Sequence, residues 1–314
     1  MKLSLNRALA LTAVGGLLLT GATACNRGGD SAAASNPKVV MALSTLNNPF
    51  FVEVRDGAQA AAKDANVQLD VVDAQNDSAT QANQLANAQT SGAKAVIVNP
   101  VDSDAASASV TSLTKSNIPV IGVDRTVNNA TLNSLVASDN VAGGKQAAEE
   151  LAAALGKKGT IIVLQGVAGT SASRDRGAGF EEGMKAFPDI KIVAKQTANF
   201  DRAAALDVTT NLLQANPGVT GVFAENDEMA LGAVQALGAK AGKDVKVVGF
   251  DGTTDGLAAI KAGTMVASIA QQPAKLGQLA VEQAAKALKG DKVDATVPVS
   301  VVTVNKTNVG DFSK

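Results

Sequence analysis

Short runs of β-branched apolar residues alternate with alanine-rich stretches of helical period from Lys38 almost to the end of this sequence. Strands are predicted over residues 39–44, 69–72, 95–98, 119–123, 133–137, 160–164, 190–194, 221–224, 245–249, 265–269 and 299–304. The helices predicted between them include 51–65, 79–91, 142–154, 202–214, 228–237 and 274–288. This alternation is typical of βαβ units, whose parallel sheets are covered by helices on both faces.

The predicted strands are many for one sheet of this kind. The chain has 314 residues, about twice the usual domain length of roughly 150. We therefore expect an α/β protein of two lobes, each built on its own doubly wound parallel sheet.

Residues 1–24 have the three parts of a secretory signal peptide. Lys2 and Arg7 supply the positive charge, residues 8–21 form a glycine-interrupted apolar run, and residues 22–24 have the small side chains of a cleavage site. The apolar run is too short for a stable membrane span. The mature protein is therefore expected outside the cytoplasm, in the periplasm or cell envelope.

The single cysteine, Cys25, directly follows this segment, where bacterial lipoproteins carry the cysteine that is acylated. Residues 25–37 are rich in small polar residues and are expected to form a flexible tether, which is useful only if its end is held. We therefore expect a lipid on Cys25. Ala22 stands where lipoprotein signals usually have Leu, so ordinary cleavage to a soluble periplasmic protein remains an alternative.

The composition excludes several classes of function. The chain has no His, Trp or Tyr, which excludes histidine-based catalysis, histidine metal ligands and Ser-His-Asp triads. One cysteine excludes an internal disulfide and a multi-thiolate zinc site. The 28 basic and 29 acidic residues give a formal charge of -1, which removes the electrostatic basis for binding nucleic acid. A small neutral ligand, with no metal or cofactor, fits this composition best.

Polar residues recur directly after the predicted strands, where open parallel sheets bind their ligands. These segments contain Asn47, Asn48, Asp124, Arg125, Gln165, Arg174, Arg176, Glu225, Asn226, Asp251 and Gln271. Each sugar hydroxyl both donates and accepts hydrogen bonds, and planar carboxylate, amide and guanidinium groups can bond to pairs of hydroxyls. The pattern therefore indicates carbohydrate binding.

Three of the 8 phenylalanines lie near these polar segments. Phe50 and Phe51 fall together in a strand-to-helix turn, and Phe200 lies in a loop between Asn199 and Asp201. A single one of them would most simply be a core residue. Together they are expected to cover the apolar C–H faces of a sugar.

Aspartates at strand ends have two possible roles. Asp201 and Asp227 each precede a predicted helix and are interpreted as helix N-caps. No helix start is clear after Asp124 or Asp251, so we expect these two to pair with nearby arginines at the ligand site.

Other polar residues at strand ends are assigned less specific roles. Glu225 and Arg174 are interpreted as parts of solvated faces. Asn99 precedes Pro100 and is either a turn residue or a support for the site.

The segments that carry these residues resemble the bacterial periplasmic D-ribose-binding proteins, which are type I periplasmic sugar-binding proteins of ABC transporters. The similar segments include STLNNPFF (44–51), DRT (124–126), QGVAGTSASRDRGAGF (165–180), NFDR (199–202), VFAENDEMALGA (222–233), VVGFDGTTDG (247–256) and ASIAQQP (267–273). The resemblance extends from about residue 38 to 305. It implies two similar lobes joined by a three-strand hinge, with residues 38–138 and 272–300 in the N-terminal lobe and residues 139–271 and 301–314 in the C-terminal lobe.

The resemblance also implies a set of sugar-binding residues. From the first lobe these are Asn48, Phe50, Phe51, Asp124 and Arg125; from the second they are Arg176, Phe200, Asn226 and Asp251, with Gln271 at the hinge. Phe50 and Phe200 would cover opposite faces of the sugar ring. Glu225 departs from the family, which often has an amide at this position.

The function implied is capture of D-ribose and delivery to an ABC-type membrane permease, by a monomer that is not an enzyme and binds no nucleic acid. A chemoreceptor is a further candidate partner. The alternative ligands are allose, another aldose or a furanose signalling molecule.

Two other classes of protein are alternatives to a binding protein. A glycoside hydrolase would use Asp124 and Asp251 as its carboxylate pair, but the general acid needs a raised pKa, and Arg125 and Arg176 are expected to lower it. A sugar-responsive repressor would carry a helix-turn-helix where this chain has its signal segment and tether.

Overall fold

The computed structural model of this protein describes residues 36–312. The predicted signal peptide, most of the predicted tether and Cys25 lie outside the described residues. No helix in the described part of the chain has the length and apolar character needed to cross a membrane.

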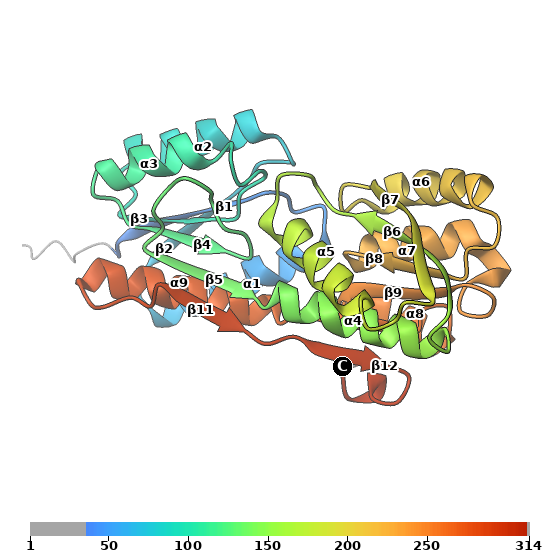
Figure 1. Cartoon of the computed structure of the whole chain (residues 1–314). Helices are drawn as coiled ribbons and strands as arrows, with labels where there is room; N and C mark the ends of the chain where they lie inside the picture. The colour runs from blue at the N-terminus through green and yellow to red at the C-terminus, as the bar shows by residue number, and fades with distance from the viewer. Residues whose placement is uncertain (1–35, 313–314) are drawn as a thin grey trace, which may run out of the picture. The chain divides into compact units, whose positions relative to one another are not determined.

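The strands of the described residues form two sheets of six strands each (Figure 1). The first sheet has the order β11-β5-β4-β3-β1-β2 and contains β1 (Lys38–Leu43), β2 (Gln68–Asp73), β3 (Ala95–Val98), β4 (Val120–Val123), β5 (Ser134–Ser138) and β11 (Thr296–Val299). The second has the order β12-β10-β9-β8-β6-β7 and contains β6 (Gly159–Gln165), β7 (Ile190–Thr197), β8 (Gly221–Ala224), β9 (Lys246–Asp251), β10 (Ala267–Ala270) and β12 (Val302–Asn305). All neighbouring strands pair in parallel except β10 and β12, which are antiparallel.

Helices cover both faces of each sheet (Figure 1). In the first lobe, α1 (Pro49–Asp64) and α9 (Pro273–Lys289) pack together on one face, and α2 (Ser78–Thr90) and α3 (Ser107–Lys115) lie on the other. In the second, α4 (Asn140–Ala154) and α5 (Ser171–Met184) cover one face, and α6 (Arg202–Ala215), α7 (Asp227–Leu237) and α8 (Thr254–Ala262) cover the other. Two short 3-10 helices, Gly238–Lys240 and Val309–Phe312, complete the described chain.

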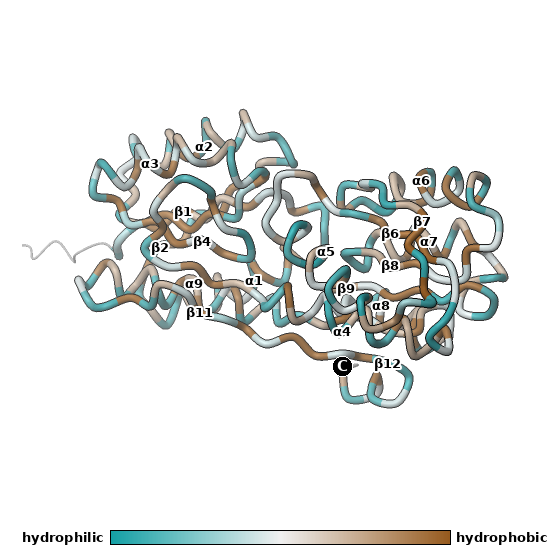
Figure 2. Tube along the Cα trace, viewed as in Figure 1, coloured by the Kyte–Doolittle hydropathy of each residue, from teal (hydrophilic) through white to brown (hydrophobic). Residues whose placement is uncertain are grey.

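The central strands are apolar because both of their faces are covered by helices. Every residue of β3, β4, β8 and β10 is buried, whereas the edge strand β7 alternates between buried or half-buried and exposed residues in its first half. Figure 2 shows apolar stretches along the strands and polar stretches in many of the connecting loops. Burial on both faces therefore explains the unbroken apolar runs of the sequence.

Each sheet reverses its direction of winding at one point. The chain order runs outward from β1 to β2 on one side and from β3 to β5 on the other, and the second sheet repeats this pattern from β6. In open α/β sheets, ligands bind beyond the carboxyl ends of the strands at such a switch point. The fold therefore provides two half-sites, one in each lobe.

Most helices begin a few residues after a strand ends, and polar side chains in these connections cap them. Side chains accept a hydrogen bond from a first-turn backbone N–H in α1, α2, α4, α5, α6, α7 and α8, the caps being Asn48, Asp77, Asp139, Thr170, Asp201, Asn226 and Thr253. Capping satisfies N–H groups that have no partner within the helix. Asp201 is thus an N-cap, as predicted.

The chain passes between the two sheets three times: from β5 to α4, from β10 to α9, and from β11 to β12. The crossing segments are bonded to one another. Asp139 N–H donates to the Val299 carbonyl at 3.1 Å, and the Gln272 side-chain amide donates to the Ser300 carbonyl at 2.9 Å.

The prediction of one strand over residues 299–304 was wrong. The structure has two short strands here, and they belong to different sheets. An apolar run shows that a segment is extended, but it does not show where its hydrogen-bonding partner changes.

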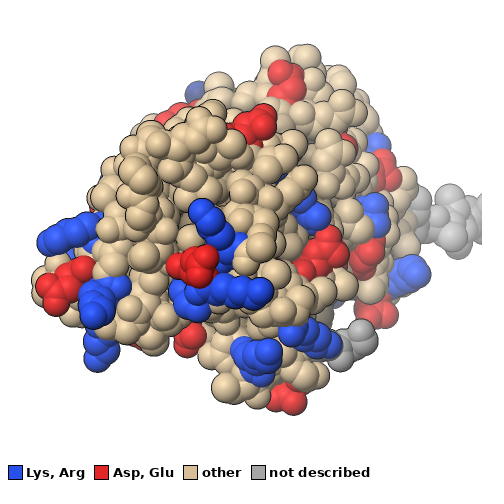
Figure 3. All heavy atoms as spheres, turned by 90° about the vertical axis from the view of Figure 1, so that its right-hand side faces the viewer, with Lys and Arg blue, Asp and Glu red and all other residues tan. Residues whose placement is uncertain are grey.

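Charges of both signs are interspersed on the surface. Figure 3 shows Lys and Arg side chains beside Asp and Glu side chains on the face it presents, with broad neutral areas between them. This mixture agrees with the near-zero formal charge of the sequence.

Candidate ligand-binding site

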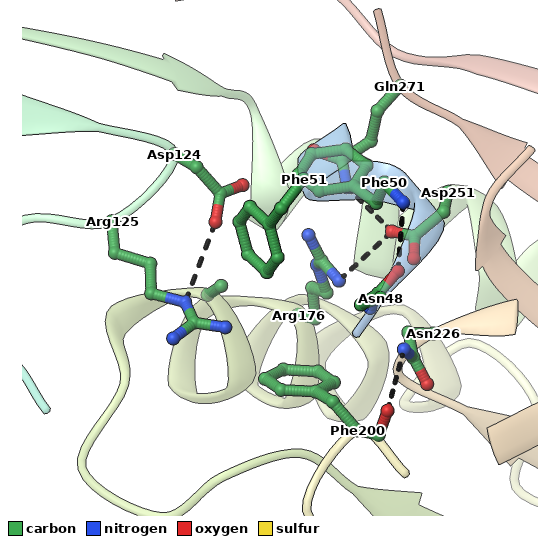
Figure 4. Close-up of a pocket in the computed structure, with 11 residues that line it drawn as sticks. Asn48, Phe50, Phe51, Asp124, Arg125, Arg176, Phe200, Asn226, Asp251 and Gln271 are labelled. Atoms are coloured by element: carbon green, nitrogen blue, oxygen red, sulfur yellow. Dashed lines mark hydrogen bonds and ion pairs between the residues drawn. The ribbon is translucent and has the colours of Figure 1, made fainter. Parts of the chain in front are cut away.

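All ten residues predicted to bind the ligand line one pocket (Figure 4). They are Asn48, Phe50, Phe51, Asp124, Arg125, Arg176, Phe200, Asn226, Asp251 and Gln271, and Ala172 is an eleventh lining residue. They lie after β1 and β4 in the first lobe, and after β6, β7, β8 and β10 or at the end of β9 in the second, so both half-sites contribute. The sequence did not point to Ala172, because an alanine carries no chemical signal.

The first lobe supplies a buried ion pair. Asp124 and Arg125 are 3% and 4% exposed, and the Asp124 Oδ2 lies 3.5 Å from the Arg125 Nε. The Asn99 amide donates to the same Oδ2 at 3.2 Å, and Arg125 Nη1 donates to the Pro100 carbonyl at 3.0 Å. Asn99 is fully buried and supports the site, which decides between its two predicted roles.

The second lobe supplies a matching pair. Arg176 Nη1 lies 3.5 Å from the Asp251 Oδ1, and both residues are at most 5% exposed. Gln271 donates from its amide to the same Oδ1 at 2.7 Å. Arg176 is held from behind by the Asn140 side chain, to which its Nε donates at 2.9 Å, and it stacks on the Phe250 ring at 3.9 Å.

Asn140 and Phe250 are supports of Arg176 that sequence reasoning missed. Phe250 directly precedes Asp251, so an aromatic residue next to a predicted site carboxylate was the available signal. No comparable signal distinguished Asn140 from any other residue in a first helical turn.

Aromatic rings lie on both sides of the pocket. Phe50 and Phe51 are buried and meet edge to face, with ring centroids 5.1 Å apart. In Figure 4 these two rings lie on one side of the Arg176 guanidinium and the Phe200 ring lies on the other. The Arg125 guanidinium lies 5.3 Å from the Phe51 ring centre and 5.5 Å from that of Phe200, so it links the aromatic residues of the two lobes.

Two asparagines combine a capping role with a place in the pocket wall. The Asn48 Oδ1 accepts from Phe50 N–H at 2.9 Å and starts α1. The Asn226 Oδ1 accepts from Met229 N–H at 2.9 Å and starts α7, while its amide donates to the Phe200 carbonyl at 3.3 Å. Capping fixes both side chains in place before any ligand arrives.

Three buried polar atoms of the pocket residues have no hydrogen-bond partner: Asp124 Oδ1, Arg125 Nε and Gln271 Oε1. Two of them are acceptors and one is a donor. Buried polar groups normally have a hydrogen-bond partner. A sugar hydroxyl can donate to either of the two acceptors and can accept from the donor. The set therefore suits a neutral polyhydroxyl ligand better than an anion or a cation.

Burial raises the pKa of Asp124, against the opposing effect of Arg125 and Arg176. Burial also raises the pKa of Asp251 well above its ordinary value, although Arg176 opposes the shift. The arginines lower both pKa values, as expected, but the net shift is upward because burial has the larger effect. Removing a carboxylate from water disfavours its charged form more than the neighbouring arginines favour it here.

The backbone at three site residues is in the left-handed region. The φ angles are 65° at Asp124, 59° at Phe200 and 119° at Asp251. Such conformations are unfavourable for residues with a side chain and persist where the surroundings impose them. Here they direct a ligand-facing side chain out of the end of a strand or loop.

The interpretation of Asp227 as an N-cap was wrong, because the cap of α7 is Asn226. Asp227 is fully buried and accepts hydrogen bonds from Thr253 N–H at 2.8 Å and from the Ser268 hydroxyl at 2.7 Å. These bonds hold the turn that follows Asp251.

The interpretation of Glu225 as a solvated residue was also wrong, because its exposed fraction is 0%. Burial raises its pKa from an ordinary 4.5 to about 7. Arg174 has a half-exposed side chain beside Asp175, as expected for a residue on a solvated face.

The two lobes touch at the rim of the pocket. Ser103 N–H of the first lobe donates to the Gly169 carbonyl of the second at 3.1 Å, and Thr126 N–H donates to the Ser171 hydroxyl at 3.0 Å. The structure therefore describes the lobes in contact around the pocket.

Comparison with known proteins gives a consistent result. A family model described as a periplasmic binding protein domain matches residues 39–292. The chain is 44% identical over 288 residues to the ribose import binding protein RbsB of Haemophilus influenzae, covering 92% of this chain and 98% of that protein. It is 45% identical over 274 residues to RbsB of Escherichia coli, covering 87% of this chain and 92% of that protein.

A solved structure extends the comparison to the fold. It is an ABC transporter periplasmic solute binding protein from Actinobacillus succinogenes with bound D-allose. It matches with a TM-score of 0.83 at 34% identity, covering 88% of this chain and 100% of the other.

Proposed function

This chain belongs to the periplasmic binding protein family, and we propose that it captures D-ribose between its two lobes and delivers the sugar to an ABC-type permease. The observation that carries the proposal is the pocket itself. It joins two carboxylates, two guanidinium groups and amides to aromatic rings on opposite sides. Relatives of nearly the same length, named for ribose import, support the choice of sugar.

In this proposal the polar groups divide the sugar hydroxyls. Asp124 and Asp251 accept hydrogen bonds from hydroxyls, Arg125 and Arg176 donate to them, and each charge is already paired with its neighbour. The phenylalanine rings cover the apolar C–H faces of the sugar ring. These ion pairs are needed in the ligand-free protein, because a buried charge without a partner would destabilise the folded state.

Closure retains the sugar. A ligand held between two lobes favours the closed state only through contacts that the open state cannot make. The rim contacts of Ser103 with Gly169 and of Thr126 with Ser171 belong to such a state. We infer that they form when ribose brings the half-sites together.

The ligand is tested by titrating the purified protein with ribose, allose, arabinose, xylose and glucose by calorimetry. Ribose should bind tightest by at least tenfold. Preferential binding of allose would favour the alternative that the related D-allose complex supports. No binding of any of these sugars would contradict the proposal.

The proposal includes no catalysis, since the family consists of solute-binding proteins. Incubation of glycosides with excess protein should release no sugar. If wild type releases sugar and Asp251→Asn does not, the result would support the glycoside hydrolase alternative.

We also propose export and a lipid on Cys25, which lies outside the described residues. Mass spectrometry of the native protein should find an acylated N-terminal cysteine in the membrane fraction. An unacylated N-terminus in the soluble fraction would contradict the anchor and leave the sugar proposal intact.

A further inference from the structure

Glu225 is a buried acid with no ligand contact in the proposed site. It follows β8 directly, its exposed fraction is 0%, and it does not line the pocket. Its backbone is fixed on both sides, since its N–H donates to the Leu164 carbonyl at 3.0 Å and its carbonyl accepts from Arg176 Nη1 at 2.7 Å. A carboxyl in such a position is costly unless hydrogen bonds compensate for its burial.

One oxygen of this carboxyl joins two other elements. The Glu225 Oε2 accepts from Gly166 N–H at 2.7 Å, in the segment after β6. It also accepts a short hydrogen bond from the Ser173 hydroxyl in the first turn of α5. The ends of β6 and β8 and the start of α5 are therefore tied together at one atom.

Each of these partners leads to a pocket residue. Ser173 lies three residues before Arg176, so the two are neighbours along one face of α5. Gly166 lies directly against the Phe200 ring, since a Cβ built on Gly166 would come within 2.0 Å of the ring. The Gly166 carbonyl also accepts from Thr197 Oγ1 at 2.6 Å, at the end of the strand that leads to Phe200.

We infer that Glu225 is a positioning residue for the sugar site, which holds Arg176 and Phe200 in the geometry that binds the ligand. The carboxyl sets the first turn of α5 relative to the segment after β6. Helix α5 carries the Arg176 guanidinium, and the segment after β6 provides the surface on which the Phe200 ring lies. The inference rests on the proposed function, because the geometry it maintains matters for sugar binding.

Replacement by glutamine and by alanine separates this role from that of a general core residue. Glu225→Gln keeps an oxygen acceptor for both Gly166 and Ser173, so ribose affinity should stay within about threefold of wild type. Glu225→Ala removes the acceptor and should weaken ribose binding more than tenfold. Ser173→Ala, which removes one of the two bonds, should give an intermediate loss and remains informative if the alanine variant at 225 does not fold.

Leu237→Ala is the control for a general loss of stability. Leu237 is buried at the far end of α7, the opposite end from the pocket. This variant should lower the melting temperature and leave ribose affinity unchanged. Equal affinities for Glu225→Ala and wild type would overturn the inference, as would a loss in Glu225→Gln as large as that in the alanine variant.

Crystal structures of the ligand-free variants give a second measurement that does not depend on ribose. Arg176 and Phe200 should be displaced in Glu225→Ala, or in Ser173→Ala, and unmoved in Glu225→Gln. If wild type binds no ribose while these displacements occur, the proposed function fails and the positioning role stands. If ribose binds and neither side chain moves in the variants, the positioning role fails alone.

Discussion

The four charged residues of the pocket form two pairs, one in each lobe. Asp124 pairs with Arg125, Asp251 pairs with Arg176, and none is more than 5% exposed. Each carboxylate also accepts an amide hydrogen bond, from Asn99 or Gln271. Charges compensated in this way can meet a neutral ligand without adding a net charge to the closed site.

The polar and the stacking contributions can be tested separately. Asp251→Ala removes charged acceptors and leaves Arg176 partly unpaired, so ribose binding should weaken by about 2 to 5 kcal/mol. Phe50→Ala should cost less, on the order of 1 to 3 kcal/mol, because it loses apolar contact without leaving a charge unpaired.

Melting curves with and without ribose provide the measurement. At about a thousand times the dissociation constant, ribose should add roughly 4 kcal/mol to the stability of wild type. Asp251→Ala should lose most of the corresponding melting shift. If it keeps the full shift across a ribose titration, Asp251 is not in the site.

Glu225 should make stability depend on pH. Its pKa is 4.5 ordinarily and about 7 in the folded protein, so between these values the unfolded chain is ionised while the folded chain keeps its proton. Unfolding then releases a proton, and stability falls as pH rises. The loss should reach about 3 kcal/mol above pH 7, from 1.36 kcal/mol per pKa unit.

Urea unfolding of wild type and Glu225→Gln at pH 5 and pH 8 checks this prediction. The glutamine variant should gain about 2.5 kcal/mol relative to wild type between pH 5 and pH 8, because part of the total loss already occurs below pH 5. Other buried acids such as Asp227 are present in both proteins, so their effects cancel. If the difference in unfolding free energy between the two proteins is the same at both pH values, the pKa of Glu225 is not raised in the folded protein.

At the scale of elements, α4 and α5 pack through glycines so that their backbones nearly touch. A Cβ on Gly144 would lie 2.3 Å from the Arg176 carbonyl oxygen, and one on Gly179 would lie 2.2 Å from that of Val141. This close packing brings Asn140, at the start of α4, to Arg176 on α5. The helix pair is therefore part of the structure that supports the site.

Gly179→Ala should force the two helices apart. Overpacking of this kind typically costs 1 to 3 kcal/mol of stability, and here ribose affinity should fall as well, because Arg176 moves with α5. Gly310→Ala is the matched control, since a Cβ there meets open space. Denaturant unfolding and ribose titration of both variants provide the measurement. If Gly179→Ala behaves like the control, the packing is looser than the distances indicate.

The sequence predicted most elements well, and it failed where an element's role depends on its partners. The apolar runs located β3 and β8 at their observed bounds. The division of residues 299–304 between two sheets was not predictable, because the hydrophobic periodicity of a strand does not identify the strand with which it pairs.

At the scale of the whole molecule, the three crossings between the lobes are where a hinge is expected. The site is completed only when both half-sites meet, so ribose should favour the closed arrangement. Small-angle scattering of wild type should show a smaller radius of gyration with saturating ribose than without it. Asp251→Ala at the same sugar concentration should show little change. An unchanged wild-type radius at saturation would contradict closure.

The local signals of the sequence were sufficient for the fold class, for the two lobes and, through the resemblance, for ten of the eleven residues that line the pocket. Hydrophobic periodicity and the residues after each strand are properties of short segments, so they can be interpreted without knowing the fold. Only the tertiary structure decided the roles of Glu225 and Asp227. The sequence alone does not distinguish an acidic residue at a strand end that faces water from one that caps a helix or lies buried between elements. Which of these occurs depends on segments distant in the chain, such as Gly166 and Ser173 for Glu225, that the fold brings together.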